Sequence, residues 1–159
     1  MTVEVTPQGT RGAGFPRLLR TLMRLGSGFM VRNYRRRGTD LRINGQPLIL
    51  LTTIGATSGA RRQVLLSRFP DGESKTSWLV TGTAGGSAMH PAWFINLAKN
   101  PDKVWVEVDR REMRVRPEGL QGEERVEAWR RIVALAPSFG DYPGKTDRQI
   151  PVIRLTAVD

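Results

Sequence analysis

A two-residue turn between strand-like segments constrains the fold of this chain more than any other feature. Asn44-Gly45 separates Leu41–Ile43 from the longer run Pro47–Thr53. Asn-Gly favours the tight turn of an antiparallel hairpin, because both residues accept positive φ angles. The uninterrupted apolar run Leu48–Leu51 predicts that the second strand is covered on both faces. We therefore expect an antiparallel sheet that contains at least one fully buried strand.

Further segments have the composition or the alternation of strands. They are Gln63–Phe69, Ser77–Thr81, Lys103–Asp109, its hairpin partner Glu112–Arg116, and a closing strand Ile150–Leu155. Pro151 lacks an amide hydrogen, which predicts an edge position for the closing strand. Hairpin-paired strands with a few helices between them do not follow an alternating βαβ pattern. The sequence thus predicts an α+β chain, in which helices pack on a mostly antiparallel barrel.

The helical segments are predicted from their spacing of apolar residues and from their end signals. They are Phe15 to about Asn33, Pro91–Lys99, and Glu123–Ala136, the last with Ala128, Ile132 and Leu135 as its buried stripe. Pro137–Gln149 is expected to be a loop.

The amino-terminal residues differ in charge and composition from the rest of the chain. We therefore predict three parts, a mobile tail (1–14), a basic amphipathic helix (15–38) and the barrel domain (39–159). The first forty residues hold eight arginines and two acidic residues, and the net charge of the chain is +10. The helix carries an apolar stripe at Phe15, Leu18, Leu19, Leu22, Leu25 and Phe29. This pattern is typical of a helix that lies on an anionic membrane surface. An ordinary helix packed on the domain, with solvated arginines, is the alternative.

Composition narrows the functional classes. The chain has no cysteine and a single histidine, His90, which excludes disulfides, thiolate nucleophiles and multi-histidine metal sites. No metal site is predicted, and no recognition motif supports nucleic-acid binding despite the positive charge. No apolar run reaches the roughly 20 residues of a membrane span. These observations favour a cytoplasmic location, with peripheral contact to the inner face of the cell membrane as an option.

The segment Thr81–Leu97 is the strongest candidate for a binding site. Small residues and hydroxyls follow a strand and lead into a helix at Pro91, so a ligand can approach the backbone closely. Exposed amides at such a helix start suit a phosphate or a carboxylate. A simple strand-to-helix connection without a ligand is the alternative.

Three segments together resemble a known family. They are Thr52–Arg62, Gly85–Leu97 with its His-Pro-Ala-Trp motif, and Asp141–Val152 with Thr-Asp-Arg-Gln-Ile-Pro-Val. They are similar to the deazaflavin-dependent nitroreductase family, whose members are oxidoreductases that use coenzyme F420. The resemblance implies a split β-barrel of the FMN-binding type with flanking helices, and a deazaflavin bound in a groove.

The resemblance also implies roles for individual residues. Thr57, Ser58, Gly59 and Arg62 would lie near the anionic tail of the coenzyme, and Gln63, Val64, Leu65 and Leu66 along its ring; Thr81, Thr83, Ala84 and Gly85 would form a second turn, and Ala92, Trp93 and Asn96 would come from the helix. Phe139 and Tyr142 would cover the substrate pocket. Tyr142, or a hydroxyl such as Thr83 or Ser67, would donate a proton or hydrogen bond to the reduced product.

The chain departs from the family pattern at three positions. Relatives usually carry Arg-Lys where this chain has Ala56-Thr57, and often a lysine where it has Ala84. Each charge-assisted contact is worth roughly 1.5–3 kcal/mol, so these losses predict weaker binding of an anionic tail. Arg61, Arg62 and Arg68 are candidates to compensate.

The leading hypothesis is an enzyme that transfers a hydride from reduced F420 to a quinone or a nitro compound. One alternative is a non-enzymatic barrel that carries a fatty acyl chain or another apolar ligand after loss of the coenzyme site. Another is a flavin enzyme that uses FMN, whose single phosphate needs fewer cations. A homodimer is compatible with each of these hypotheses.

Overall fold

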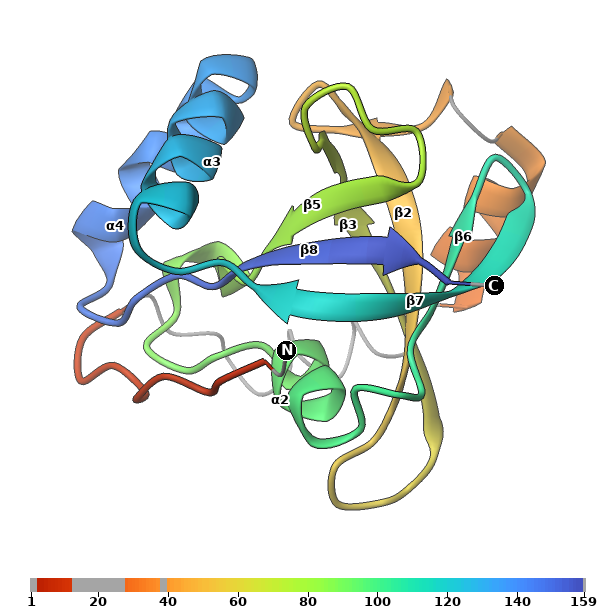
Figure 1. Ribbon diagram of the computed structural model, residues 1–159, viewed down its shortest axis with the longest axis horizontal. Coiled ribbons are helices and arrows are strands. Elements are labelled where there is room, and N and C mark those ends of the chain that lie inside the picture. Colours follow the sequence, from red (N-terminus) through yellow and green to blue (C-terminus); the bar gives the residue numbers. More distant parts are fainter. Residues whose placement is uncertain (1–2, 13–27, 38–39, 159) are drawn as a thin grey trace.

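The computed structural model describes residues 3–12, 28–37 and 40–158, and its eight strands form one curled sheet (Figure 1). The strands are β1 Arg42–Ile43, β2 Gln46–Ile54, β3 Arg61–Ser67, β4 Phe69–Pro70, β5 Ser77–Thr81, β6 Trp105–Val108, β7 Arg111–Gly119 and β8 Val152–Ala157. Their order is β1-β2-β6-β7-β8-β5-β4, and β3 pairs with β2. All of these pairings are antiparallel, and the fold is the split β-barrel that the resemblance implied.

Strand β2 is buried on both faces, as its apolar run predicts. Leu48, Ile49, Leu50 and Leu51 are each at most 1% exposed. Ile49 and Leu51 join the main core with Trp93, Phe94 and Leu97 of α2 (Ala92–Lys99), while Leu48 and Leu50 pack on the other side. There they contact Val31 and Tyr34 of the helical residues 28–37. β2 pairs with β1, β3 and β6, and both of its faces lie inside the domain.

Both predicted hairpins are present. Asn44 and Gly45 between β1 and β2 have φ angles of 54° and 75°, so both residues of the turn lie in the left-handed region. The second hairpin joins β6 to β7 through Asp109 and Arg110, with φ angles of 51° and 66°. Two consecutive positive φ angles match the right-handed twist of the paired strands.

The expected edge position of the closing strand is wrong. β8 lies between β7 and β5, and its ladder begins at Val152, one residue after Pro151. The missing amide of Pro151 therefore costs no hydrogen bond of the ladder, and its carbonyl accepts one from the amide of Gly82 at 2.9 Å. A proline just before a strand is compatible with a central position.

The carboxyl-terminal helical region also differs from expectation. In α3 (Gly122–Leu135), Ala128 and Ile132 are buried as predicted, but Leu135 is 48% exposed and Ala136 is buried in its place. The predicted loop contains a short 3-10 helix, η3 (Pro137–Asp141), followed by α4 (Tyr142–Lys145). Phe139 of η3 packs edge-on against Phe69 at 5.3 Å between ring centroids, so a core contact orders this segment. Figure 1 shows α3 and α4 together at one end of the sheet.

The amino-terminal residues lie against the domain where a mobile tail was expected. Residues 3–12 have no regular secondary structure, yet Val3 is 5% exposed and belongs to the main core. The positions Phe15, Leu18, Leu19, Leu22 and Leu25 of the predicted stripe lie outside the described residues. Phe29 of that stripe is 74% exposed, whereas Val31 and Tyr34 turn inward.

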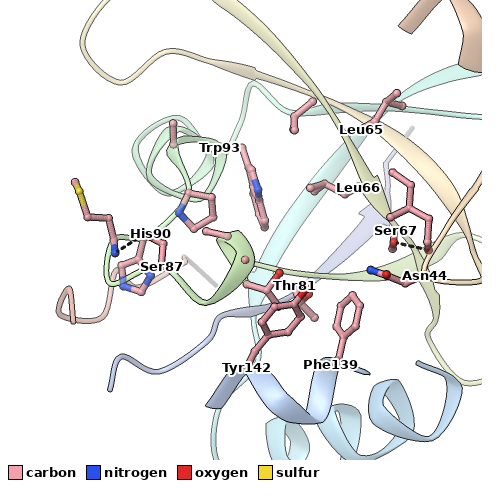
Figure 2. Close-up of a pocket in the computed structure, with 18 residues that line it drawn as sticks. Asn44, Leu65, Leu66, Ser67, Thr81, Ser87, His90, Trp93, Phe139 and Tyr142 are labelled. Atoms are coloured by element: carbon pink, nitrogen blue, oxygen red, sulfur yellow. Dashed lines mark hydrogen bonds between the residues drawn. The ribbon is translucent and has the colours of Figure 1, made fainter. Parts of the chain in front are cut away.

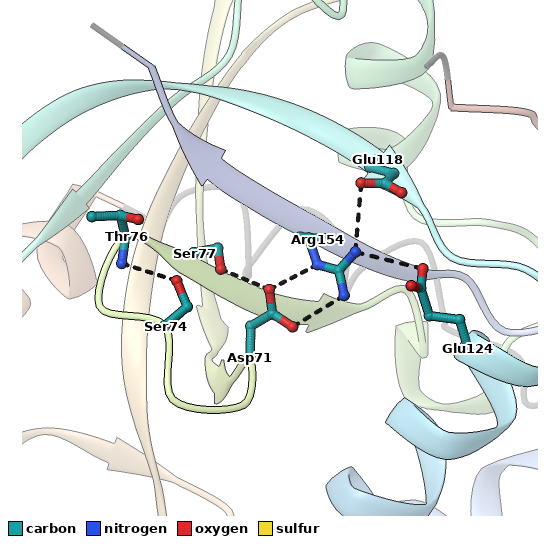
Figure 3. A network of polar contacts seen from close by, with 7 residues as sticks. All are labelled: Asp71, Ser74, Thr76, Ser77, Glu118, Glu124 and Arg154. Atoms are coloured by element: carbon teal, nitrogen blue, oxygen red, sulfur yellow. Dashed lines mark hydrogen bonds and ion pairs between the residues drawn. The ribbon is translucent and has the colours of Figure 1, made fainter.

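A network of ion pairs joins β7, β8, α3 and the loop between β4 and β5 (Figure 3). Arg154 of β8 donates to both carboxylate oxygens of Asp71, at 2.7 and 3.2 Å, and lies within 3.6 Å of Glu118 on β7 and Glu124 on α3. Burial alone would raise the pKa of Asp71, but hydrogen bonds from Arg154 and Ser77 outweigh it and lower the pKa below 3.8.

We expect Asp71→Asn to lower the free energy of unfolding by about 2 kcal/mol at neutral pH, because it removes charge-assisted hydrogen bonds from a half-buried guanidinium. Urea denaturation measures this value. Asp109→Asn is the matched control, because Asp109 lies 4.0 Å from Arg68 and its side chain is 57% exposed. The control should change stability by less than about 0.5 kcal/mol.

The same pair of variants tests the pH dependence. The pKa of Asp71 is lower in the folded chain than in the unfolded chain. Its contribution to the free energy of unfolding is therefore complete above about pH 5 and declines as the pH falls below about 4. The stability difference between the wild type and Asp71→Asn should therefore shrink at pH 3. An unchanged difference would contradict the assigned role.

Candidate functional site

A cavity of about 720 Å³ opens between β3, the segment after β5, and the η3–α4 region (Figure 2). Figure 2 shows Leu65 and Leu66 on one side and Phe139 and Tyr142 on the opposite side. The lining residues are Ile43, Asn44, Val64, Leu65, Leu66, Ser67, Thr81, Thr83, Ala84, Gly85, Ser87, Met89, His90, Pro91, Ala92, Trp93, Phe139 and Tyr142. Its size and mainly apolar walls are typical of a small-molecule site.

Strand β3 forms one wall because its other edge stays open. Among the described strands β3 pairs with β2 alone, so Val64, Leu65 and Leu66 are only partly covered. These three predicted residues line the cavity. Arg62 and Gln63 precede them on the same strand, are exposed, and do not line it.

The turn after β5 forms a second wall with its backbone. Ala84, Gly85 and Gly86 have φ angles of 46°, 63° and 82°. The predicted residues Thr81, Thr83, Ala84 and Gly85 all line the cavity. Left-handed backbone with little or no side chain lets a ligand approach the peptide groups. At Ala84, a residue with a Cβ, this conformation costs on the order of 1 kcal/mol.

Helix α2 contributes Ala92 and Trp93 to the lining, but not Asn96. Asn96 is 8% exposed; its amide accepts a hydrogen bond from the backbone N–H of Ala56 at 2.9 Å and donates to the hydroxyl of Thr53 at 3.3 Å. Asn96 therefore fixes the turn between β2 and β3 to α2. A contact of Asn96 with a coenzyme stays a prediction.

The β2–β3 turn holds Thr57, Ser58 and Gly59, which are exposed and lie outside the cavity lining. Lys99 of α2 donates to the carbonyl of Ala56 at 2.9 Å, which places a cation beside this turn. Of the arginines expected to compensate, Arg61 pairs with Glu112 and Arg68 donates to the carbonyl of Leu48 at 2.6 Å. Arg68 is thus committed to β2.

Phe139 and Tyr142 form the side of the cavity that faces β3. Their rings meet edge-on at 5.4 Å, and Phe139 is 4% exposed. The ammonium of Lys145 lies 5.3 Å from the centre of the Tyr142 ring. These contacts fix both rings at the cavity, and their predicted role toward a substrate stays a prediction.

Sequence reasoning did not assign Arg148 to the site, although its motif was noticed. Arg148 is 5% exposed, and its guanidinium donates to the carbonyls of Thr83 and Ser87, both at 2.8 Å, and to Nδ1 of His90 at 3.2 Å. All three partners line the cavity. Arg148 therefore clamps the turn that forms the second wall.

His90 connects Arg148 to the amino-terminal segment through hydrogen bonds. A guanidinium only donates, so Nδ1 of His90 accepts and Nε2 carries the proton, which it donates to the carbonyl of Thr6 at 2.8 Å. Burial lowers the pKa of His90 below 6.5, and the charge of Arg148 lowers it further, against the effect of the Thr6 carbonyl. His90 is thus a neutral structural bridge.

Asp147 anchors the same segment. It accepts hydrogen bonds from the hydroxyl and the amide of Thr10 and from the amide of Arg11. These bonds, the Thr10 hydroxyl first, lower the pKa of Asp147 to about 2. Residues 3–12 are thereby held against the turn after β5, which forms the second wall of the cavity.

Several other lining residues carried no individual prediction as ligand contacts, although some lie in the candidate segment Thr81–Leu97. They are Ser87, Met89 and Pro91 of that segment, and Ile43 and Asn44 of the β1–β2 hairpin. The His-Pro dipeptide was a usable signal, because it marked the start of α2. For Asn44 the turn preference explained the residue by itself, so nothing in the local pattern pointed to a cavity.

The fold and the cavity define a split-barrel protein with a large small-molecule site. The sequence profile of the F420H(2)-dependent quinone reductase family matches residues 24–157. The chain belongs to this family of oxidoreductases, whose members use reduced F420, and the resemblance found in the sequence is confirmed.

Individual relatives agree with this assignment. Rv3178 of Mycobacterium tuberculosis, named as a candidate F420H(2)-dependent quinone reductase, is 31% identical over 84% of this chain and 98% of its own length. The solved structure of an F420-H2 dependent reductase, FDR-A, is 34% identical with a TM-score of 0.60, over 72% of this chain and 98% of that one. A structure described as a domain-swapped dimer is 31% identical with a TM-score of 0.61, over 86% and 98%.

Two features are absent from the described residues. No helix in residues 28–37 or 40–158 is long and apolar enough to cross a membrane. Nor does this part of the chain bring together three or more metal-ligating side chains.

We expect Arg148→Lys to lower the free energy of unfolding by about 2–3 kcal/mol. A lysine keeps the charge, but its ammonium cannot reach all three groups that accept hydrogen bonds from the planar guanidinium. Arg130→Lys is the matched control, since Arg130 pairs with Glu127 and its side chain is 72% exposed. Urea denaturation of both variants measures the difference. Equal stabilities would show that the clamp is not needed.

Proposed function

We propose that this protein binds reduced F420 in the cavity and transfers a hydride to a quinone. Family membership and the lining of the cavity support this proposal together. The observation that carries it is the convergence on one cavity of three distant segments in which the resemblance implies site residues, Val64–Leu66, Thr81–Trp93 and Phe139–Tyr142.

The residues of the cavity fit a deazaflavin. A volume of about 720 Å³ is sufficient for a flat ring system, and the apolar side chains Val64, Leu65 and Leu66 offer it a wall. Ala84 and Gly85 would let a polar ring edge or the linker approach the backbone. Trp93 and Ala92 would close the other end. When bound, the reduced coenzyme supplies the hydride.

Two cations replace part of the positive charge that the chain lacks at Ala56, Thr57 and Ala84. Lys99 lies at the carbonyl of Ala56, and Lys145 lies beside Tyr142 with its side chain against Gly86. We propose that they act with Arg62, Thr57, Ser58 and Gly59 on the anionic tail. FMN as the cofactor, and an apolar ligand without a coenzyme, are the alternatives that the binding test below separates.

In this proposal Tyr142 is the catalytic residue of the chain. Its hydroxyl would donate a proton or a hydrogen bond to the oxygen of the acceptor as charge develops there. Phe139 supports the ring of Tyr142 and excludes water from that side. Nitro compounds, whose oxygens also accept hydrogen bonds, are further candidate acceptors.

We also propose a cytoplasmic protein that meets its acceptor at the inner face of the membrane. Phe29 and Met30 are 74% and 43% exposed, on helical residues that also carry Arg32, Arg36 and Arg37. Apolar side chains next to arginines suit an anionic bilayer surface. A homodimer is proposed by analogy with the relative described as a dimer.

A fluorescence titration with F420 tests the coenzyme, with FMN in a parallel cell. We expect a dissociation constant in the micromolar range or tighter, about 8 kcal/mol of binding free energy. No binding of F420 below about 1 mM would contradict the proposal. Tight FMN binding or co-purified lipid would then identify the flavin or the carrier alternative.

The two tyrosines of the chain provide a matched pair for catalysis. Tyr142→Phe should lower kcat with menadione about 100-fold through loss of the proton donor. Tyr34→Phe is the control: Tyr34 is 3% exposed, donates to the carbonyl of Glu107 at 2.8 Å, and is not among the residues that line the cavity. It should lose about 1 kcal/mol of stability and keep its kcat. A Tyr142→Phe enzyme with more than half of the wild-type kcat would contradict the assignment.

A further inference from the structure

We infer that Asn44 binds the carbonyl oxygen of the quinone and so determines where the acceptor lies in the cavity. This inference rests on the proposed function and adds an acceptor subsite to it. The subsite is the end of the cavity formed by Asn44, Ile43, Ser67 and Phe139, which we call the hairpin end.

The β1–β2 turn places Asn44 at the cavity. Asn44 and Gly45 both have positive φ angles, so the turn is held in one conformation by its two residues and the strands on either side. Figure 2 shows the side-chain amide of Asn44 directed toward the space between Leu66 and Phe139. Asn44 suits the β1–β2 turn by its conformational preference, and it also presents a polar group to the cavity.

At the hairpin end, the side-chain amide of Asn44 is the polar group best placed to bind a ligand. The hydroxyl of Ser67 donates to the backbone carbonyl of Ile43 at 3.1 Å, so its proton is already used. Leu66 and Phe139 offer apolar surface above and below (Figure 2). A polar group among apolar side chains orients a ligand that has one matching polar atom.

The chemistry of an amide matches both forms of a quinone. Nδ2 of Asn44 is a donor for the carbonyl oxygen of the quinone, and Oδ1 is an acceptor for the hydroxyl of the quinol. Neither contact requires Asn44 to change its protonation state. The side chain can therefore hold the substrate and release a product of similar shape.

The two ends of the cavity differ in a way that assigns the acceptor to the hairpin end. The opposite end is built from the positive-φ turn, Pro91 and Trp93, where backbone groups are accessible. A deazaflavin bound at this opposite end and along β3 would leave the hairpin end free for the ring of the quinone. Tyr142 lies between the two ends in Figure 2, and its ring contacts Phe139 of the hairpin end.

The test uses two variants that preserve the turn. Gly and Asp are both accepted in Asn-Gly-type turns, so Asn44→Gly removes the amide and Asn44→Asp replaces the donor by a carboxylate, without a change in backbone conformation. The probe is menadione, a quinone without a long side chain. Its binding is followed by quenching of tryptophan fluorescence, to which Trp93 in the cavity wall contributes, in the free protein and with oxidised F420.

We expect Asn44→Gly to raise the dissociation constant and the KM of menadione about 5- to 10-fold, the effect of losing one neutral hydrogen bond. Asn44→Asp should raise them by more than about 10-fold, because a carboxylate repels the carbonyl oxygen. The affinity for F420 should stay within about twofold of wild type in both variants, and urea denaturation should confirm that they are folded.

Menadione binding that is unchanged in both variants, or absent in the wild type under both conditions, would overturn the inference. An equal loss of F420 affinity would also overturn it, because Asn44 would then serve the coenzyme. If the wild type fails to bind F420, the proposed function fails separately, and the titration of menadione into the free protein still decides the role of Asn44.

Discussion

A single buried guanidinium holds the borders of the cavity together. Arg148 donates to Thr83, Ser87 and His90, and His90 in turn donates to Thr6. A charge removed from water is costly unless every donor finds a partner, so this arrangement is stable only when the turn, the carboxyl-terminal loop and residues 3–12 are in place together. The walls of the site therefore form as a unit.

The barrel supplies what such a clamp requires, a rigid frame with one open edge. β2 is buried on both faces and pairs with β3 and β6, while β3 leaves its outer edge open to the cavity. The connecting segments Thr81–Trp93 and Phe139–Tyr142, which include short helical turns, complete the walls. Binding groups on loops that a scaffold positions are the usual division between stability and function.

Local pattern failed where a long-range contact decided the outcome. Pro151 suggested an edge strand, but its nitrogen, which has no hydrogen to donate, falls just outside the ladder of a strand paired on both sides. Leu135 continued the helical period, yet the chain turns at Ala136 and buries that smaller residue instead. Residues 3–12 read as a tail because their partners, Asp147 and His90, lie more than eighty positions away.

The sequence by itself determined the hairpins, the doubly buried β2 strand and the family, because turn preferences, apolar periodicity and short motifs are properties of neighbouring residues. Tertiary structure alone decided which candidates meet in one cavity. It brought Leu66, Thr83 and Tyr142 together, used Asn96 to fix a turn, and gave Asn44 a place at the cavity. Those outcomes depend on how the sheet curls and on which distant groups satisfy each buried donor, and no local pattern contains that information.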